Sequence, residues 1–154
     1  MENLIPFTFS DLAKITNHRS GEIKFGEKML TVPKNMEATA FLKTCEAKYV
    51  LVGIPEDIGV RANFGRPGTS SAWESALKSI ANIQNNRFCK ATRILILGQV
   101  DVAKEMELAE KFDYTKVEDR QQLSKLVEKI DKHVTHIICT IVKSGKIPII
   151  IGGG

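Results

Sequence analysis

Two arginines in a glycine-rich loop are the residues of this sequence whose types and spacing could bind a ligand. The loop runs from Gly53 to Trp73 and carries Arg61 and Arg66 just before the expected start of a helix. Free N–H groups and the helix dipole at such a start favour an anion, and a guanidinium group fits a carboxylate or a phosphate. The loop is not a Walker loop, because no Gly-Lys-Ser/Thr follows, and it lacks the G-x-G-x-x-G pattern of dinucleotide sites. The competing interpretation is structural, with Asp57 pairing with an arginine simply to hold the loop.

The histidines and the remaining strand-end carboxylate are expected to have structural roles. His133 and His136 are three residues apart on the longest expected helix, but no third ligand accompanies them, so we expect a surface pair rather than a metal site. His18 has no evident partner. Asp101 follows an expected strand, where it would cap a turn. Trp73 is expected in the core, although it could also line a pocket together with Phe64.

Composition and charge exclude several classes of function. The 154 residues include 22 Lys and Arg and 18 Asp and Glu, a net charge of +4. The basic residues are scattered without interleaved aromatic residues, so we expect no nucleic-acid partner. There is no apolar run of about 20 residues and no secretory pattern, so we expect no membrane association. Three widely spaced cysteines, Cys45, Cys89 and Cys139, indicate reduced core or boundary thiols of a cytoplasmic protein.

The elements that must position the loop are predicted by apolar periodicity. Continuous apolar and β-branched runs predict buried strands at 49–54, 93–98 and 147–151. Helical spacing predicts one helix that Thr69 or Ser70 caps and that reaches residue 83. It also predicts a short helix at 106–112 and a long helix that opens with the capping-box pattern Thr115 to Glu118 and ends before Gly145.

Alternating strands and helices predict an α/β fold. Such an order favours right-handed crossovers and a parallel sheet with helices on both faces, which is a three-layer α/β/α sandwich. Residues 1–46 lack clear periodicity, and we expect an arm that packs on the domain, with short helices at 11–15 and 36–44. Residues 47–154 form the domain itself. We expect its sheet to be truncated after the third strand.

Several motifs follow the expected strands. Val-Gly-Ile-Pro is followed by Glu-Asp-Ile-Gly-Val-Arg-Ala-Asn-Phe-Gly-Arg-Pro-Gly-Thr-Ser-Ser-Ala-Trp, which ends at Trp73. Gly-Gln-Val-Asp ends at Asp101, and the long helix leads to Ile-Ile-Ile-Gly-Gly-Gly. Together these motifs resemble the ureohydrolases, the family of arginase, agmatinase and formimidoylglutamase. The resemblance covers about residues 47–154, and the wording of 61–68 is most similar to the formimidoylglutamase branch.

The resemblance implies an arginase-like sandwich with a binuclear manganese site at the carboxyl ends of the strands. In that family the two ions share a hydroxide that attacks a guanidinium or formimino carbon. The family's first metal-binding histidine comes directly after the glycine turn, which here ends at Gly154, and the other ligands lie further on. We therefore expect no metal ligand and no catalytic residue within residues 1–154, and we expect this chain alone to be inactive.

The predicted function is that of the N-terminal portion of a manganese-dependent hydrolase of small linear amidines. Within it, we expect one of Arg61, Asn63 and Arg66 to contact the carboxylate of an amino-acid substrate, with loop scaffolding as the competing role. The alternative is a stand-alone α/β module that binds an anionic small ligand through the loop 61–66. The unpaired apolar strand 147–151 predicts a homo-oligomer or self-association through the sheet edge.

Overall fold

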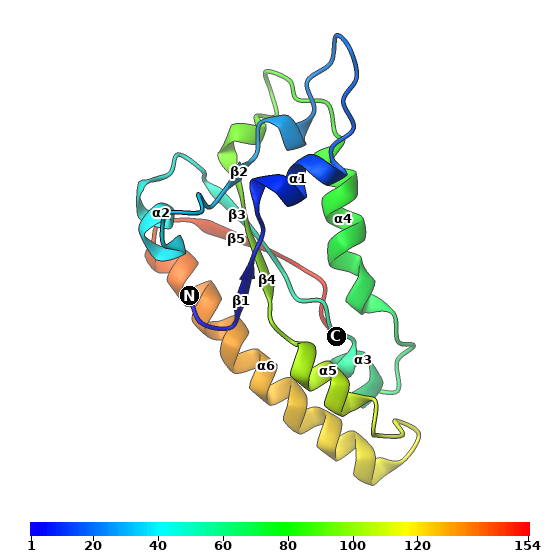
Figure 1. Ribbon diagram of the computed structural model, residues 1–154. Coiled ribbons are helices and arrows are strands. Elements are labelled where there is room, and N and C mark those ends of the chain that lie inside the picture. Colours follow the sequence, from blue (N-terminus) through cyan, green and yellow to red (C-terminus); the bar gives the residue numbers. More distant parts are fainter.

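The computed structural model describes residues 1–154 and shows an α/β fold built on one mixed, open sheet (Figure 1). The sheet has five strands: β1 (Leu4–Pro6), β2 (Leu30–Thr31), β3 (Tyr49–Gly53), β4 (Ile94–Val100) and β5 (Ile147–Ile151). Their order is β1-β4-β3-β5. β2 pairs with the first half of β4, at Leu95 and Ile96, whereas β1 pairs with its second half. The three strands predicted from apolar runs are therefore β3, β4 and β5, the longest strands of the sheet.

Helices pack on both faces of this sheet. The α-helices are α1 (Phe9–Ile15), α2 (Ala38–Thr44), α3 (Ile58–Ala62), α4 (Ala72–Ala81), α5 (Ala103–Ala109) and α6 (Val117–Lys143). Short 3-10 turns are η1 (Phe25–Glu27), η2 (Thr69–Ser71) and η3 (Ala91–Arg93). Successive strand side chains point to opposite faces, so each of β3 and β4 contributes to two separate hydrophobic clusters. Val50 and Leu95 pack with α6, whereas Leu51 and Ile96 pack with α4.

The expectation of a purely parallel sheet is corrected by β1. The pairs β3–β4, β3–β5 and β2–β4 are parallel, but β1 runs antiparallel to β4. Both extra strands come from residues 1–46, which were expected to form an arm with short helices. A run as short as Leu4–Pro6 shows no periodicity of its own, and its strand conformation depends on the hydrogen bonds that β4 offers. The bond from Phe7 N–H to Leu97 C=O, 3.3 Å long, continues this contact.

The helix ends show where local patterns succeed and fail. Thr69 does not cap α4, because η2 intervenes and α4 begins at Ala72 without a side-chain cap; the Thr69 hydroxyl donates to the Glu56 carbonyl at 3.1 Å. Thr115 does not open a capping box either, because α6 begins two residues later with Lys116 at the N-cap position, and the Thr115 hydroxyl donates to Asp113. The predicted end of α6 is confirmed. Gly145 has a φ of 73° and its N–H donates to the Val142 carbonyl.

β5 forms one edge of the sheet and exposes apolar side chains there. The prediction of a strand at 147–151 is therefore confirmed but that of its burial is wrong, because β3 is the only strand that pairs with it. The Ile147 N–H donates to the Lys48 carbonyl and the Ile151 carbonyl accepts from the Ile54 N–H, both at 2.9 Å. Because backbone groups alternate along a strand, those of Pro148 and Ile150 point away from β3. Proline is tolerated at such an outward position, since no ladder partner needs its N–H.

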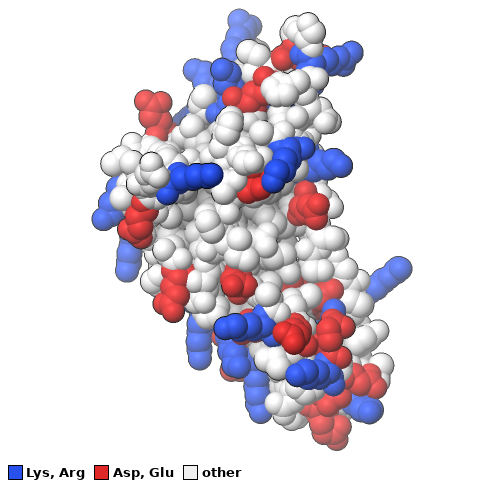
Figure 2. Space-filling model, viewed as in Figure 1, with Lys and Arg blue, Asp and Glu red and all other residues white.

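The surface carries both signs of charge, intermingled over the face that Figure 2 shows. The cysteines are unpaired; Cys45 is half-buried, but Cys89 and Cys139 are exposed, so the expectation of core or boundary positions fails for these two. Neither α6 nor any shorter helix combines the length and the apolar content that crossing a membrane requires.

Candidate functional site

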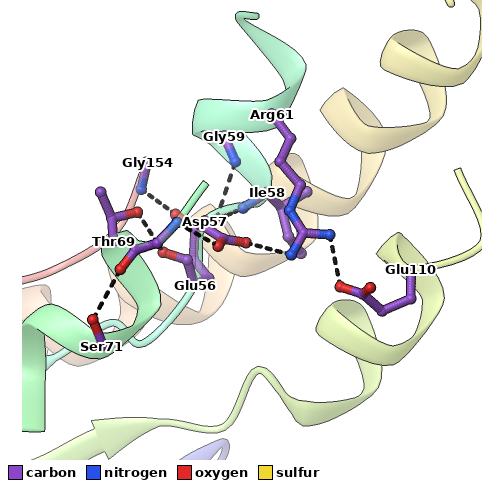
Figure 3. Close-up of polar contacts among 10 residues, drawn as sticks. Glu56, Asp57, Ile58, Gly59, Arg61, Thr69, Ser71, Glu110 and Gly154 are labelled. Carbon is purple, nitrogen blue, oxygen red and sulfur yellow. Dashed lines mark hydrogen bonds and ion pairs between the residues drawn. The ribbon is translucent and has the colours of Figure 1, made fainter. Parts of the chain in front are cut away.

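The loop after β3 and the glycine turn after β5 meet at the carboxyl ends of these two parallel strands. α3 lies in that loop, and the turn Gly152–Gly154 approaches it so closely that side chains are excluded. Figure 3 shows Gly154 bonded to Glu56 beside the start of α3. A Cβ atom on Gly59 would lie 2.5 Å from the carbonyl oxygen of Gly154, and one on Gly154 would lie 2.3 Å from the Val60 nitrogen. Contacts that short do not occur in folded proteins, so glycine is required at both positions. The carboxyl ends of parallel strands are where α/β folds place their ligand sites.

Glu56 joins the two segments through its buried carboxylate. The residue is only 3% exposed. One carboxylate oxygen accepts the N–H groups of Ile58, at 2.5 Å, and Gly59, at 3.1 Å, and the other accepts the N–H of Gly154. The Glu56 carbonyl also accepts from the Thr69 hydroxyl. Three segments are thus held by one residue: the start of α3, the end of the turn and η2.

Asp57 and Arg61 hold the rest of the loop. Asp57 is 4% exposed; its Oδ2 accepts from the Gly68 N–H at 2.9 Å and its Oδ1 lies 2.9 Å from Arg61 Nη2. The other end of the guanidinium group donates to Glu110 Oε1, beyond the end of α5, at 2.7 Å. Burial lowers the pKa of Arg61. The hydrogen bond to Glu110 and the charges of Asp57 and Glu110 raise this pKa by more than burial lowers it, so it lies above its ordinary value. The structural interpretation of the loop, with Asp57 paired to an arginine, is confirmed for Arg61.

The three residues predicted to bind substrate are not brought together. The Arg61 side chain is 15% exposed and is held by two carboxylates. Asn63 donates its side-chain N–H to the Gly59 carbonyl at 3.1 Å, so it finishes α3. Arg66 is exposed and forms neither an ion pair nor a hydrogen bond. Of the three, Arg66 alone has a guanidinium group free for a ligand, and substrate contact by any of them stays a prediction.

The two aromatic residues of the loop lie apart from each other. Phe64 has a φ of 58°, is 66% exposed, and stacks with the Arg120 guanidinium carbon, 3.4 Å from the ring centre, which ties the loop to α6. Trp73 is buried in the core, as predicted. Trp73 also lines a cavity of about 310 Å³ between α1 and α4, together with Phe7, Asp11, Lys14, Ile15, Glu74, Leu77 and Gln99.

The other candidate side chains lie away from this site. His136 is exposed and His133 half-buried; both line a shallow cavity of about 260 Å³ with Glu2, Asn3 and Lys132. His18, for which no partner was expected, lies 3.4 Å from Glu27. Asp101 accepts the Ala103 N–H at 3.2 Å, which confirms its role in the turn.

The side chains of the site do not fit a metal ion. No three His, Cys, Asp or Glu side chains gather anywhere in the structure. At the site itself, the oxygens of Glu56 face backbone N–H groups, and those of Asp57 face the Gly68 N–H and the Arg61 guanidinium group. These two carboxylates therefore arrange the backbone around this edge of the sheet.

The residue that the sequence argument missed is Glu56. A signal was present, since Glu56 and Asp57 lie at the carboxyl end of a buried strand, separated from β3 only by Ile54 and Pro55. The bond to Gly154, 98 residues away, has no local signature. Comparison with protein-family models, with curated proteins and with solved structures found no match.

Proposed function

We propose that this chain is the N-terminal portion of a manganese-dependent hydrolase of C–N bonds in linear amidines, of the ureohydrolase type. The observation that carries the proposal is the meeting of the loop 53–69 with the turn Gly152–Gly154 at the carboxyl ends of adjacent parallel strands. These two segments also carry the sequence motifs that resemble the family. In open α/β sheets, ligand sites form at this place.

The proposal assigns residues 1–154 a scaffolding part in the site. They hold the loop and the turn through buried carboxylates, and they do not fit manganese by themselves, so no chemical step is assigned to them. The arginase-like sandwich belongs to the same proposal: β4, β3 and β5 are its first parallel strands, and β1 and β2 are additions from residues 1–46. The manganese ligands, in this proposal, follow Gly154.

The alternative function, an anion-binding module that uses the loop 61–66, has less support. Arg61 faces two carboxylates, so its charge is already balanced, and its one guanidinium nitrogen without a partner, Nε, is buried where a ligand does not reach it. Only Arg66 remains for an anion. Saturable binding of inorganic phosphate or acetate to the wild-type chain, abolished by Arg66→Ala, would favour the module over the hydrolase.

The proposed function is tested by comparing two polypeptides: residues 1–154, and the product of the whole reading frame. Each is purified with manganese and supplied with arginine, agmatine or formiminoglutamate, and the release of urea or formamide is measured. We expect the whole product to retain manganese and to hydrolyse one amidine, with activity lost after chelation and regained with manganese, and we expect residues 1–154 to do neither. Stoichiometric manganese and turnover in residues 1–154 would overturn the proposal, and so would a whole product that lacks both.

A further inference from the structure

We propose that Glu56 is a positioning residue that fixes the backbone of the turn Gly152–Gly154. Its carboxylate spans from the start of α3 to the Gly154 N–H, and Glu56 itself is only 3% exposed, whereas the turn reaches the surface at Gly154. Apart from this bond, no hydrogen bond holds Gly154. The position of Gly154 relative to the loop therefore depends on the Glu56 side chain.

The chemistry of the contact requires a carboxylate rather than a neutral polar group. The Glu56 carboxylate has three partners, and all are backbone N–H groups. Both carboxylate oxygens must therefore accept hydrogen bonds, and neither can donate one. Hydrogen bonds to an ionised acceptor are about twice as strong as neutral ones. No Lys or Arg pairs with Glu56, and the nearest ion pair belongs to Asp57. The negative charge is therefore stabilised by the backbone segments that it organises.

Three successive glycines need such an anchor. Glycine loses more conformational freedom on folding than any other residue, so an unanchored Gly-Gly-Gly segment would sample many conformations. The close contacts of Gly154 with Gly59 and Val60 are steric, so they keep the turn from moving into α3 but do not attract it. Glu56 supplies the attraction that keeps it there. If the proposed function holds, the residue that follows this turn is the first metal ligand, and that clause alone rests on the proposed function.

The test is amide hydrogen exchange, followed by NMR, in residues 1–154 of the wild type, Glu56→Gln and Glu110→Gln. In Glu56→Gln an NH₂ group replaces one oxygen and faces an N–H donor. We expect exchange at Gly154 to accelerate at least tenfold, with a smaller acceleration at Ile58 and Gly59, while the amides of β3 and β4 stay protected. Glu110→Gln changes a carboxylate of the same neighbourhood that touches no amide of the turn, so it should leave Gly154 unchanged.

A second variant guards against general unfolding. Glu56→Asp keeps the charge but is one methylene shorter, so it should lose the Gly154 contact and retain one at the start of α3. The positioning role is overturned if the Gly154 amide exchanges freely in the wild type, or if Glu56→Gln leaves its exchange unchanged. This measurement uses neither metal nor substrate. The positioning role of Glu56 and the proposed function can therefore be contradicted independently of each other.

Discussion

Arg61 occupies a position where a single side chain connects two carboxylates from different elements. Asp57 is buried, whereas Glu110 is 67% exposed. Removing the arginine leaves the Asp57 carboxylate without its cation in a place that water does not reach. Removing the Glu110 charge leaves Arg61 with its buried partner. The two ends of this connection therefore differ in what they contribute to stability.

We expect Arg61→Ala to lower the free energy of unfolding by about 2 kcal/mol, because it strands a buried charge. The matched variant Glu110→Gln should cost less than about 1 kcal/mol, as is typical of exposed ion pairs. Urea unfolding of both variants and the wild type measures the difference. Equal losses in the two variants would show that Asp57 does not depend on Arg61.

The roles of the loop residues could be predicted in part from their types and spacing. A glycine-rich loop with two arginines and Asp57 predicted that the loop either binds an anion or pairs with its own carboxylate, and for Arg61 the pairing is confirmed. The partner Glu110 lies 49 residues away and could not be foreseen from spacing. Asn63 was one of three residues of which one was expected to contact substrate; its amide donates to the Gly59 carbonyl, and the substrate contact stays a prediction.

Helix starts and helix ends behave differently in this chain. The caps expected at Thr69 and Thr115 are absent, because α4 and α6 begin only at Ala72 and Val117, and the two hydroxyls donate to Glu56 and Asp113 instead. The end of α6 was predicted correctly, because a left-handed residue is needed there and Gly145 supplies it without steric cost. The sequence pattern thus predicted the end of α6, where the backbone conformation requires a particular residue. It did not predict the starts of α4 and α6, where the threonine side chains form other hydrogen bonds.

The junction of α6 and β5 supplies a prediction at the scale of one element. A Cβ on Gly145 would meet no atom within 4 Å, so only its φ of 73° opposes substitution. Gly145→Ala should cost about 1 kcal/mol, and Gly145→Asn should cost less, because asparagine tolerates the left-handed region better than alanine does. Urea unfolding measures both losses. An alanine variant as stable as the wild type would contradict this account of the helix end.

The whole molecule is an α/β fold whose sheet ends in an exposed apolar strand. The three long strands and the long helix were predictable because their apolar runs are continuous or strictly periodic. The mixed character of the sheet was not, because β1 and β2 are two or three residues long and pair only through tertiary contacts. Self-association through β5 was expected from the sequence, and it stays a prediction.

We expect the wild-type chain to self-associate at high concentration through the free edge of β5. Ile150, whose backbone faces that edge, is exposed there, and Ile150→Lys should weaken association about tenfold, or about 1.4 kcal/mol, by placing a charge on the edge. Val142→Lys, on the exposed face of α6, is the matched control and should associate as the wild type does. Light scattering over a concentration series decides. A wild-type chain that stays monomeric throughout would contradict the prediction.

The function that we propose requires the loop 53–69 and the turn Gly152–Gly154 to form one wall of a manganese-dependent amidine hydrolase site. The sharpest test is the sequence of the coding DNA beyond the codon for Gly154. We expect a histidine codon in the next position, followed further downstream by codons for Asp-x-His-x-Asp. Any other codon directly after Gly154, or the absence of that later motif from the reading frame, would contradict it.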